Sequence, residues 1–134
     1  MKYLSLDYGQ ARVGMALGDS ETNVAVGKGI LEGLTQNKLI EKIKAIVNLE
    51  KIDRLIVGLP LNMDGKETAM TKEVLLFVEK LRGHLAIAVQ TIDERLSSQM
   101  ADTLLKDFKG EKKQDQVAAQ IILQNYLDRQ KQLQ

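Results

Sequence analysis

The chain has 134 residues, of which 44% are hydrophobic, 28% charged and 4% aromatic, and its formal net charge is +1. This length and composition are typical of one soluble globular domain, so we expect residues 1–134 to form a single domain. The absence of cysteine excludes disulfides, thiolate zinc sites, iron–sulfur clusters and a cysteine nucleophile, and the lone His84 excludes a multi-histidine metal site. The longest apolar run has about seven residues, far short of the roughly 20 that span a bilayer, and the first residues lack the apolar stretch of a secretory signal. A cytoplasmic protein is therefore expected.

Short apolar runs predict an antiparallel meander in the first third of the chain. Residues 2–7 and 12–18 are predicted to form a hairpin around Gly9, and a third strand, weakened by glycines, is expected over residues 24–30. From residue 37 the apolar positions recur every three or four residues, which indicates an amphipathic helix.

Strands and helices then alternate. The expected elements are a strand at 54–58, a helix at 66–81 ended by Gly83, a strand at 85–92, a helix at 95–105 and a helix at 115–127. Three strands followed by this alternation predict an α/β fold whose mixed sheet begins as a meander and continues through parallel crossovers.

Asp7 is the first candidate for chemistry, because it closes the first predicted strand just before Gly9 and Gly14. The carboxyl ends of strands form the edge at which open α/β sheets bind ligands. An aspartate beside a glycine is also ordinary hairpin chemistry, and taken alone Asp7 favours that explanation. The two glycines could let a phosphate approach the backbone, which is a weak signal.

Three further acids lie at the ends of predicted elements. Asp93 and Glu94 directly follow a strand; Asp93 is better explained as a helix cap, whereas for Glu94 the capping and functional explanations are equally good. Asp115 opens the last predicted helix and follows residues 106–113, which contain four lysines and two acids. Its ordinary explanation is a helix N-cap that follows a solvated loop. Together, Asp7, Glu94 and Asp115 offer the oxygen ligands that Mg²⁺ prefers, and paired Mg²⁺ ions promote phosphodiester cleavage.

The loop over residues 57–68 is a further candidate, since it follows a predicted strand and precedes a helix. It contains Gly58, Gly65, a rigid proline and polar donors that include Asn62. These groups could hold a phosphate or a sugar, and a simple turn is the alternative.

Together these motifs resemble the YqgF/RuvX family, whose members are described as Holliday-junction resolvases and as nucleases that mature the 16S ribosomal RNA precursor. The matching segments occur in the family's order and cover nearly the whole chain: residues 7–16, 58–65, 93–98 and 115–123. The resemblance implies a ribonuclease H-like α/β fold similar to that of the resolvase RuvC, with a mixed five-stranded sheet flanked by helices.

The resemblance also implies roles for single residues. Asp7, Glu94 and Asp115 correspond to the family's acidic positions, which are catalytic and bind metal. Substrate contact or support of the site is implied for three more residues: Arg12, Asn62 and Arg95.

The implied activity is metal-assisted hydrolysis of nucleic-acid phosphodiesters, with Mg²⁺ or Mn²⁺ as cofactor and no covalent enzyme intermediate. Maturation of the 16S rRNA precursor during ribosome biogenesis is the favoured function, and resolution of Holliday junctions in branched DNA is the alternative. A net charge of +1 gives one monomer a modest hold on nucleic acid, so substrate shape, a homodimer or a ribosomal partner is expected to contribute.

Two other classes of function compete with a nuclease. The spacing of Asp7, Gly9 and Gly14 is similar to the first phosphate loop of actin-like ATPases, but those enzymes need two such lobes and this chain supplies one. A non-catalytic module that binds RNA or protein could keep the same fold, and the presence of all three acids argues against it.

Overall fold

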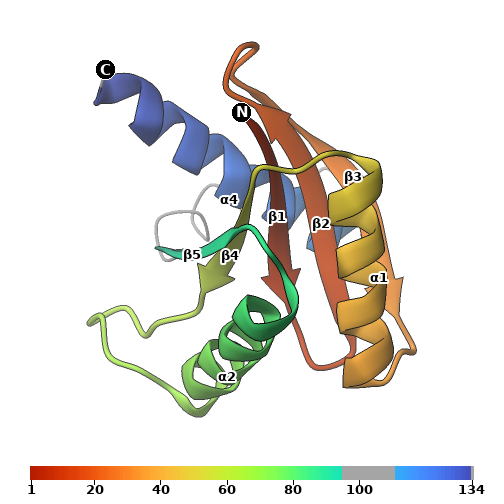
Figure 1. Ribbon diagram of the computed structural model, residues 1–134. Helices are drawn as coiled ribbons and strands as arrows, with labels where there is room; N and C mark the ends of the chain where they lie inside the picture. The colour runs from red at the N-terminus through yellow and green to blue at the C-terminus, as the bar shows by residue number, and fades with distance from the viewer. Residues whose placement is uncertain (95–110, 134) are drawn as a thin grey trace.

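The structure, a computed structural model, describes residues 1–94 and 111–133, with side chains from residue 115 onward in the second segment. A five-stranded sheet with the order β3-β2-β1-β4-β5 lies at its centre (Figure 1). The described elements are β1 (Lys2–Tyr8), β2 (Arg12–Asp19), β3 (Val24–Glu32), α1 (Gln36–Leu49), β4 (Arg54–Leu59), α2 (Ala69–His84), β5 (Ala88–Asp93) and α4 (Glu111–Gln132).

The sheet is mixed, as predicted. β1 pairs antiparallel with β2, and β2 with β3, whereas β4 runs parallel to both β1 and β5. The meander followed by parallel crossovers is therefore confirmed, and β1 is the central strand.

Helices cover both faces of the sheet: Figure 1 shows α1 and α2 on one face and α4 on the other. Along β1, Leu4 and Leu6 join the core beneath α1 and α2, while Tyr3 packs in the core beneath α4. On that second face the buried Ser5 hydroxyl donates a hydrogen bond to the Ala119 carbonyl of α4 at 2.7 Å. Because both faces are covered, residues 3–6 of β1 are all buried, and the polar one, Ser5, needs its hydrogen bond to α4.

Helix α2 begins three residues later than predicted and does not end at Gly83, which lies inside it. Its true start is set by a capping box, in which the Thr68 side chain accepts from the Thr71 backbone N–H and the Thr71 side chain accepts from the Thr68 backbone N–H. The predicted start was wrong because apolar spacing alone does not locate a cap.

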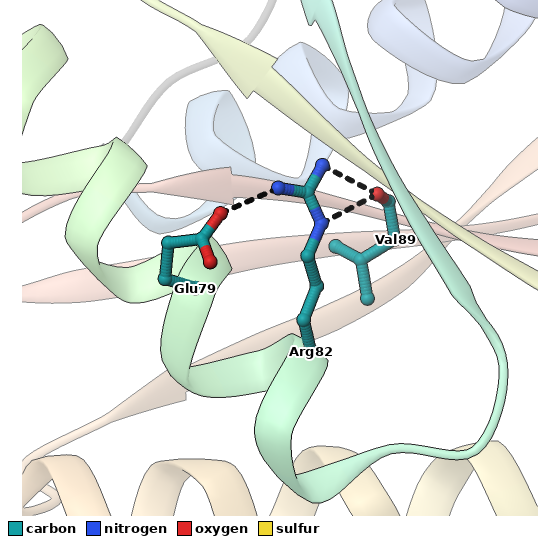
Figure 2. Close-up of polar contacts among 3 residues, drawn as sticks. All are labelled: Glu79, Arg82 and Val89. Atoms are coloured by element: carbon teal, nitrogen blue, oxygen red, sulfur yellow. Dashed lines mark hydrogen bonds and ion pairs between the residues drawn. The ribbon is translucent and has the colours of Figure 1, made fainter.

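Arg82 near the end of α2 binds the edge strand β5. Its Nε and Nη2 atoms donate to the Val89 carbonyl at 3.2 and 3.0 Å, and its Nη1 atom pairs with Glu79 at 2.6 Å (Figure 2). One side chain thus fixes the last turn of α2 against the sheet.

The two ends of the predicted strand at 85–92 differ from β5. The strand begins only at Ala88, because the backbone N–H of Leu85 donates to Leu81 and closes α2. At its other end β5 reaches Asp93, so Asp93 belongs to the strand.

Helix α4 begins at Glu111, four residues before its predicted start at Asp115. Residues 111–114 are glutamate, lysine and glutamine, which all favour helices. Their high charge had suggested a solvated loop instead. Asp115 is therefore not the N-cap. The helix predicted over residues 95–105 lies outside the described residues. None of the helices in residues 1–94 and 111–133 has the length and apolar character needed to cross a membrane.

Candidate active site

Asp7 and Glu94 lie at the ends of two strands that do not touch each other. Asp7 is the penultimate residue of β1, Glu94 directly follows β5, and β4 runs between them. The Glu94 backbone N–H donates to the Leu59 carbonyl of β4 at 3.3 Å, which keeps the chain beside β4 past the end of β5. The Glu94 side chain then passes over Gly58, and its carboxyl forms a hydrogen bond with Asp7.

The two carboxyls disturb each other's protonation. The pKa of Asp7 is raised to about 6, chiefly by burial and then by the charge of Asp115, while the hydrogen bond from Glu94 lowers it. The pKa of Glu94 is raised to about 7, chiefly by burial, then by the charges of Asp7 and Asp93 and by the hydrogen bond to Asp7. Around neutral pH the pair therefore shares a proton, with Glu94 as donor and Asp7 as acceptor.

Asp115 is brought to the same face of the sheet by α4. The helix approaches β2 so closely at Gly14 that a Cβ there would lie 2.0 Å from the Asp115 carbonyl oxygen. The open side of Gly14 is thus filled by the helix backbone, and the suggestion that this glycine admits a phosphate is wrong. The Asp115 carboxylate accepts from Arg12 Nε at 2.7 Å, and its charge reaches Asp7.

The other predicted site residues lie apart from this cluster or outside the described residues. Asn62 is exposed in the loop between β4 and α2, where its backbone N–H donates to the Lys66 carbonyl and its carbonyl accepts from Gly65. An isolated bridge between Leu61 and Glu67 closes this loop. Arg95 lies outside the residues that the structure describes.

A divalent cation would meet donors of suitable chemistry here. Asp7 and Glu94 present adjacent, half-desolvated carboxyls whose mutual repulsion a cation would relieve. Among the side chains that the structure describes, however, no three His, Cys, Asp or Glu residues stand together as ready metal ligands. Asp115 is instead engaged by Arg12. Metal binding by the three acids therefore stays a prediction.

Two glycines shape the site in a way that the sequence analysis, which related them to phosphate binding, did not predict. Gly58 leaves the space that the Glu94 carboxyl occupies, and Gly14 lets the segment around Asp115 approach the sheet. A glycine inside a strand was the available signal, because it marks a place where another group comes close.

The sequence is similar to that of known proteins along nearly the whole chain. The sequence model of the RuvX family, described as Holliday junction resolvase, matches residues 1–129. A protein of Natranaerobius thermophilus named "Putative pre-16S rRNA nuclease" is 38% identical over 97% of this chain and 96% of its own length. A Thermus thermophilus protein of the same name is 36% identical over 96% of this chain and 98% of its own length.

Solved structures give the fold. RuvC of T. thermophilus in complex with a Holliday junction superposes with a TM-score of 0.66 at 12% identity and covers 98% of this chain and 96% of its own. The fowlpox virus resolvase in complex with junction DNA superposes with a TM-score of 0.59 at 12% identity, over 97% of this chain and 99% of its own. The predicted ribonuclease H-like fold is thereby confirmed. The chain belongs to the RuvX family.

Proposed function

We propose that this protein is a metal-dependent nuclease that hydrolyses phosphodiester bonds in nucleic acid. The observation that carries the proposal is the half-buried pair of Asp7 and Glu94, with Asp115 close enough to raise the pKa of Asp7. A fold gains nothing in stability from crowding acids in this way, whereas a cation-dependent enzyme needs them. Membership of a family described as resolvases supports the same conclusion.

Asp7, Glu94 and Asp115 would hold Mg²⁺ or Mn²⁺, which in nucleases activates water and stabilises the leaving oxygen. Arg12 keeps Asp115 oriented through their 2.7 Å ion pair until the cation arrives. Its guanidinium is partly exposed and can also contact a substrate phosphate. Asn62 and Arg95 keep their proposed roles in substrate contact.

The 16S rRNA precursor is the substrate that we propose, because the relatives that match over nearly their whole length carry that activity in their name. Such a substrate implies work in the cytoplasm beside a ribosomal partner. Branched DNA is the second candidate substrate, since the family is described by junction resolution. A homodimer would suit branched DNA, because its two active sites could each cut one of a pair of strands in the junction.

Both substrates belong in one experiment. A labelled 16S precursor RNA and a four-way DNA junction are incubated together with Mg²⁺ or Mn²⁺, and the products are resolved on a gel. We expect metal-dependent RNA cleavage that is lost in Asp7→Asn and kept in Glu41→Gln, which changes an exposed acid on α1.

Junction cleavage that disappears in Asp7→Asn would replace the RNA substrate with branched DNA. If well-folded protein cuts neither substrate with either metal, the nuclease proposal is wrong and a binding role takes its place.

A further inference from the structure

Gly58 occupies the position between the two acids. The parallel register pairs Leu6 of β1 with Val57 of β4, so the next residues along the two strands are Asp7 and Gly58. On its other side Gly58 pairs with Ile92 of β5, two residues before Glu94. Any side chain at position 58 on this face would therefore stand in the path from Glu94 to Asp7.

The space over Gly58 is already full. A Cβ atom added there would lie 2.5 Å from Glu94 Oε2 and 2.6 Å from Ile122 Cδ1, both closer than non-bonded atoms approach. The backbone itself does not require glycine, because the positive-φ glycines in the described residues are Gly29, Gly33 and Gly65. Glycine in a strand interior weakens the strand, so its benefit here lies in the absence of a side chain.

Both neighbours of that space are restrained. Ile122 is only 1% exposed and belongs to the core beneath α4, so its side chain has little room to move. Glu94 is restrained by its backbone hydrogen bond to Leu59 and by its carboxyl contact with Asp7. A methyl group at position 58 would therefore press on the carboxyl of Glu94 and on α4, and the test must separate these two effects.

We infer that Gly58 is a positioning residue of the active site: its missing side chain forms the passage through which Glu94 reaches across β4 to Asp7. The inference rests on the proposed function in assigning these two acids to metal binding. The passage explains how carboxyls from two strands that are not neighbours meet at one point.

The test is a double-mutant cycle read by Mn²⁺ titration calorimetry on metal-free protein. Gly58→Ala is expected to weaken Mn²⁺ binding about 10- to 100-fold, the usual effect of disturbing a group that orients a ligand. In a Glu94→Ala background the same substitution is expected to change Mn²⁺ affinity less than about twofold, because the carboxyl that it would displace is absent. Equal losses in both backgrounds would overturn the inference.

The Ile122→Val substitution distinguishes an effect on the Glu94 carboxyl from an effect on the packing of α4. It removes the Cδ1 atom that the new methyl group at position 58 would also meet. We expect Gly58→Ala to weaken Mn²⁺ binding equally with and without Ile122→Val. Recovery of affinity in the double variant would show that Gly58 only accommodates α4. Gly83→Ala is the matched control, because its added Cβ meets nothing within 4 Å.

A second readout requires no metal. Carboxyl ¹³C resonances of Asp7 and Glu94 are followed against pH in the wild type and in Gly58→Ala. We expect the variant to lose the mutual dependence of the two titrations while keeping the wild-type amide spectrum elsewhere. Unchanged titrations would refute the passage. If the titrations separate but the wild type binds no Mn²⁺, the passage stands and the proposed function fails.

Discussion

The carboxyls of Asp7 and Glu94 are costly to keep in the folded protein. Their pKa values are raised to about 6 and about 7, so between about pH 4 and 7 the folded chain binds more protons here than the unfolded chain does. The free energy of unfolding therefore falls as pH rises through that window, and the penalty is constant above about pH 7. Replacing one of these acids with a neutral residue is therefore expected to stabilise the folded protein, although the position is proposed to be functional.

Asp7→Asn tests this sign. Since asparagine carries no charge, we expect it to raise the free energy of unfolding by on the order of 1–3 kcal/mol at pH 8 and by much less near pH 4.5. Urea denaturation in EDTA at both pH values measures the difference. Glu41→Gln, an exposed acid on α1, is the control and should show no such pH dependence. A variant less stable than the wild type at pH 8 would contradict the interpretation.

At the scale of residues, the sequence pointed to acids that the structure brings close together, and it said less about their surroundings. Asp7 and Glu94 lie at strand ends as predicted, whereas Asp115 was expected at the start of the last helix and lies inside α4. The pairing of Arg12 with Asp115 joins residues 103 positions apart, and no local pattern encodes such a contact. The role of Gly58 was missed for a similar reason, because an empty volume has meaning only once its neighbours are known.

Secondary-structure elements in this protein are joined by a few specific contacts. Arg82 links α2 to the edge strand β5 through two hydrogen bonds to the Val89 carbonyl (Figure 2). The carbonyls of an edge strand otherwise remain open to water or to another chain. Arg82 thus holds the helix in place and occupies part of that edge.

Arg82→Met keeps much of the apolar stem and removes the donors. We expect the free energy of unfolding to fall by about 1 kcal/mol, because the guanidinium is half exposed and its hydrogen bonds are worth less than buried ones. Urea denaturation provides the measurement, and hydrogen exchange should show faster opening of β5. Arg82→Lys should recover little, since one ammonium group cannot reproduce the two-pronged contact. Full stability in Arg82→Lys would indicate that charge alone matters.

Gly83, the next residue, provides a prediction of opposite sign. It lies inside α2, and a Cβ there would meet nothing within 4 Å. Gly83→Ala is therefore expected to raise the free energy of unfolding by roughly 0.5–1 kcal/mol through the better helix propensity of alanine. A decrease in the same urea titration would mean that the helix ends before Gly83, as its sequence first suggested.

At the scale of elements, periodicity located the described strands and helices well and their ends poorly. The mixed sheet, a meander followed by parallel crossovers, followed from the succession of three strands and then alternating helices and strands. The start of α2 depended on Thr68 and Thr71 bonding each other, and that of β5 on Leu85 being used to close α2. The ends of elements depend on individual hydrogen bonds, whereas the spacing of apolar residues indicates only which face of an element is buried.

For the whole molecule, the proposed function predicts that Mn²⁺ or Mg²⁺ stabilises the fold. At a cation concentration of 100 times the dissociation constant, the gain is about 2.7 kcal/mol, which for a domain of this size raises Tm by roughly 10 °C. Thermal unfolding with and without cation measures it. Asp7→Asn should abolish the shift, and Ca²⁺ should reproduce part of it as another hard cation. An identical rise in Asp7→Asn would place the cation elsewhere.

The proposed site takes one acid from the first strand and another from α4, and this spacing has a consequence during synthesis. Residue 115 is polymerised 108 residues after residue 7, which at about 5 to 20 residues per second is a delay of about 5 to 20 s. Throughout that interval β1 has no α4 to cover it, Ser5 lacks its Ala119 partner and the charge of Asp115 is missing. Under the proposed function, a growing chain therefore lacks one of the three acids that would hold the metal. Cleavage of nucleic acid would begin only after α4 has been made and has packed on the sheet.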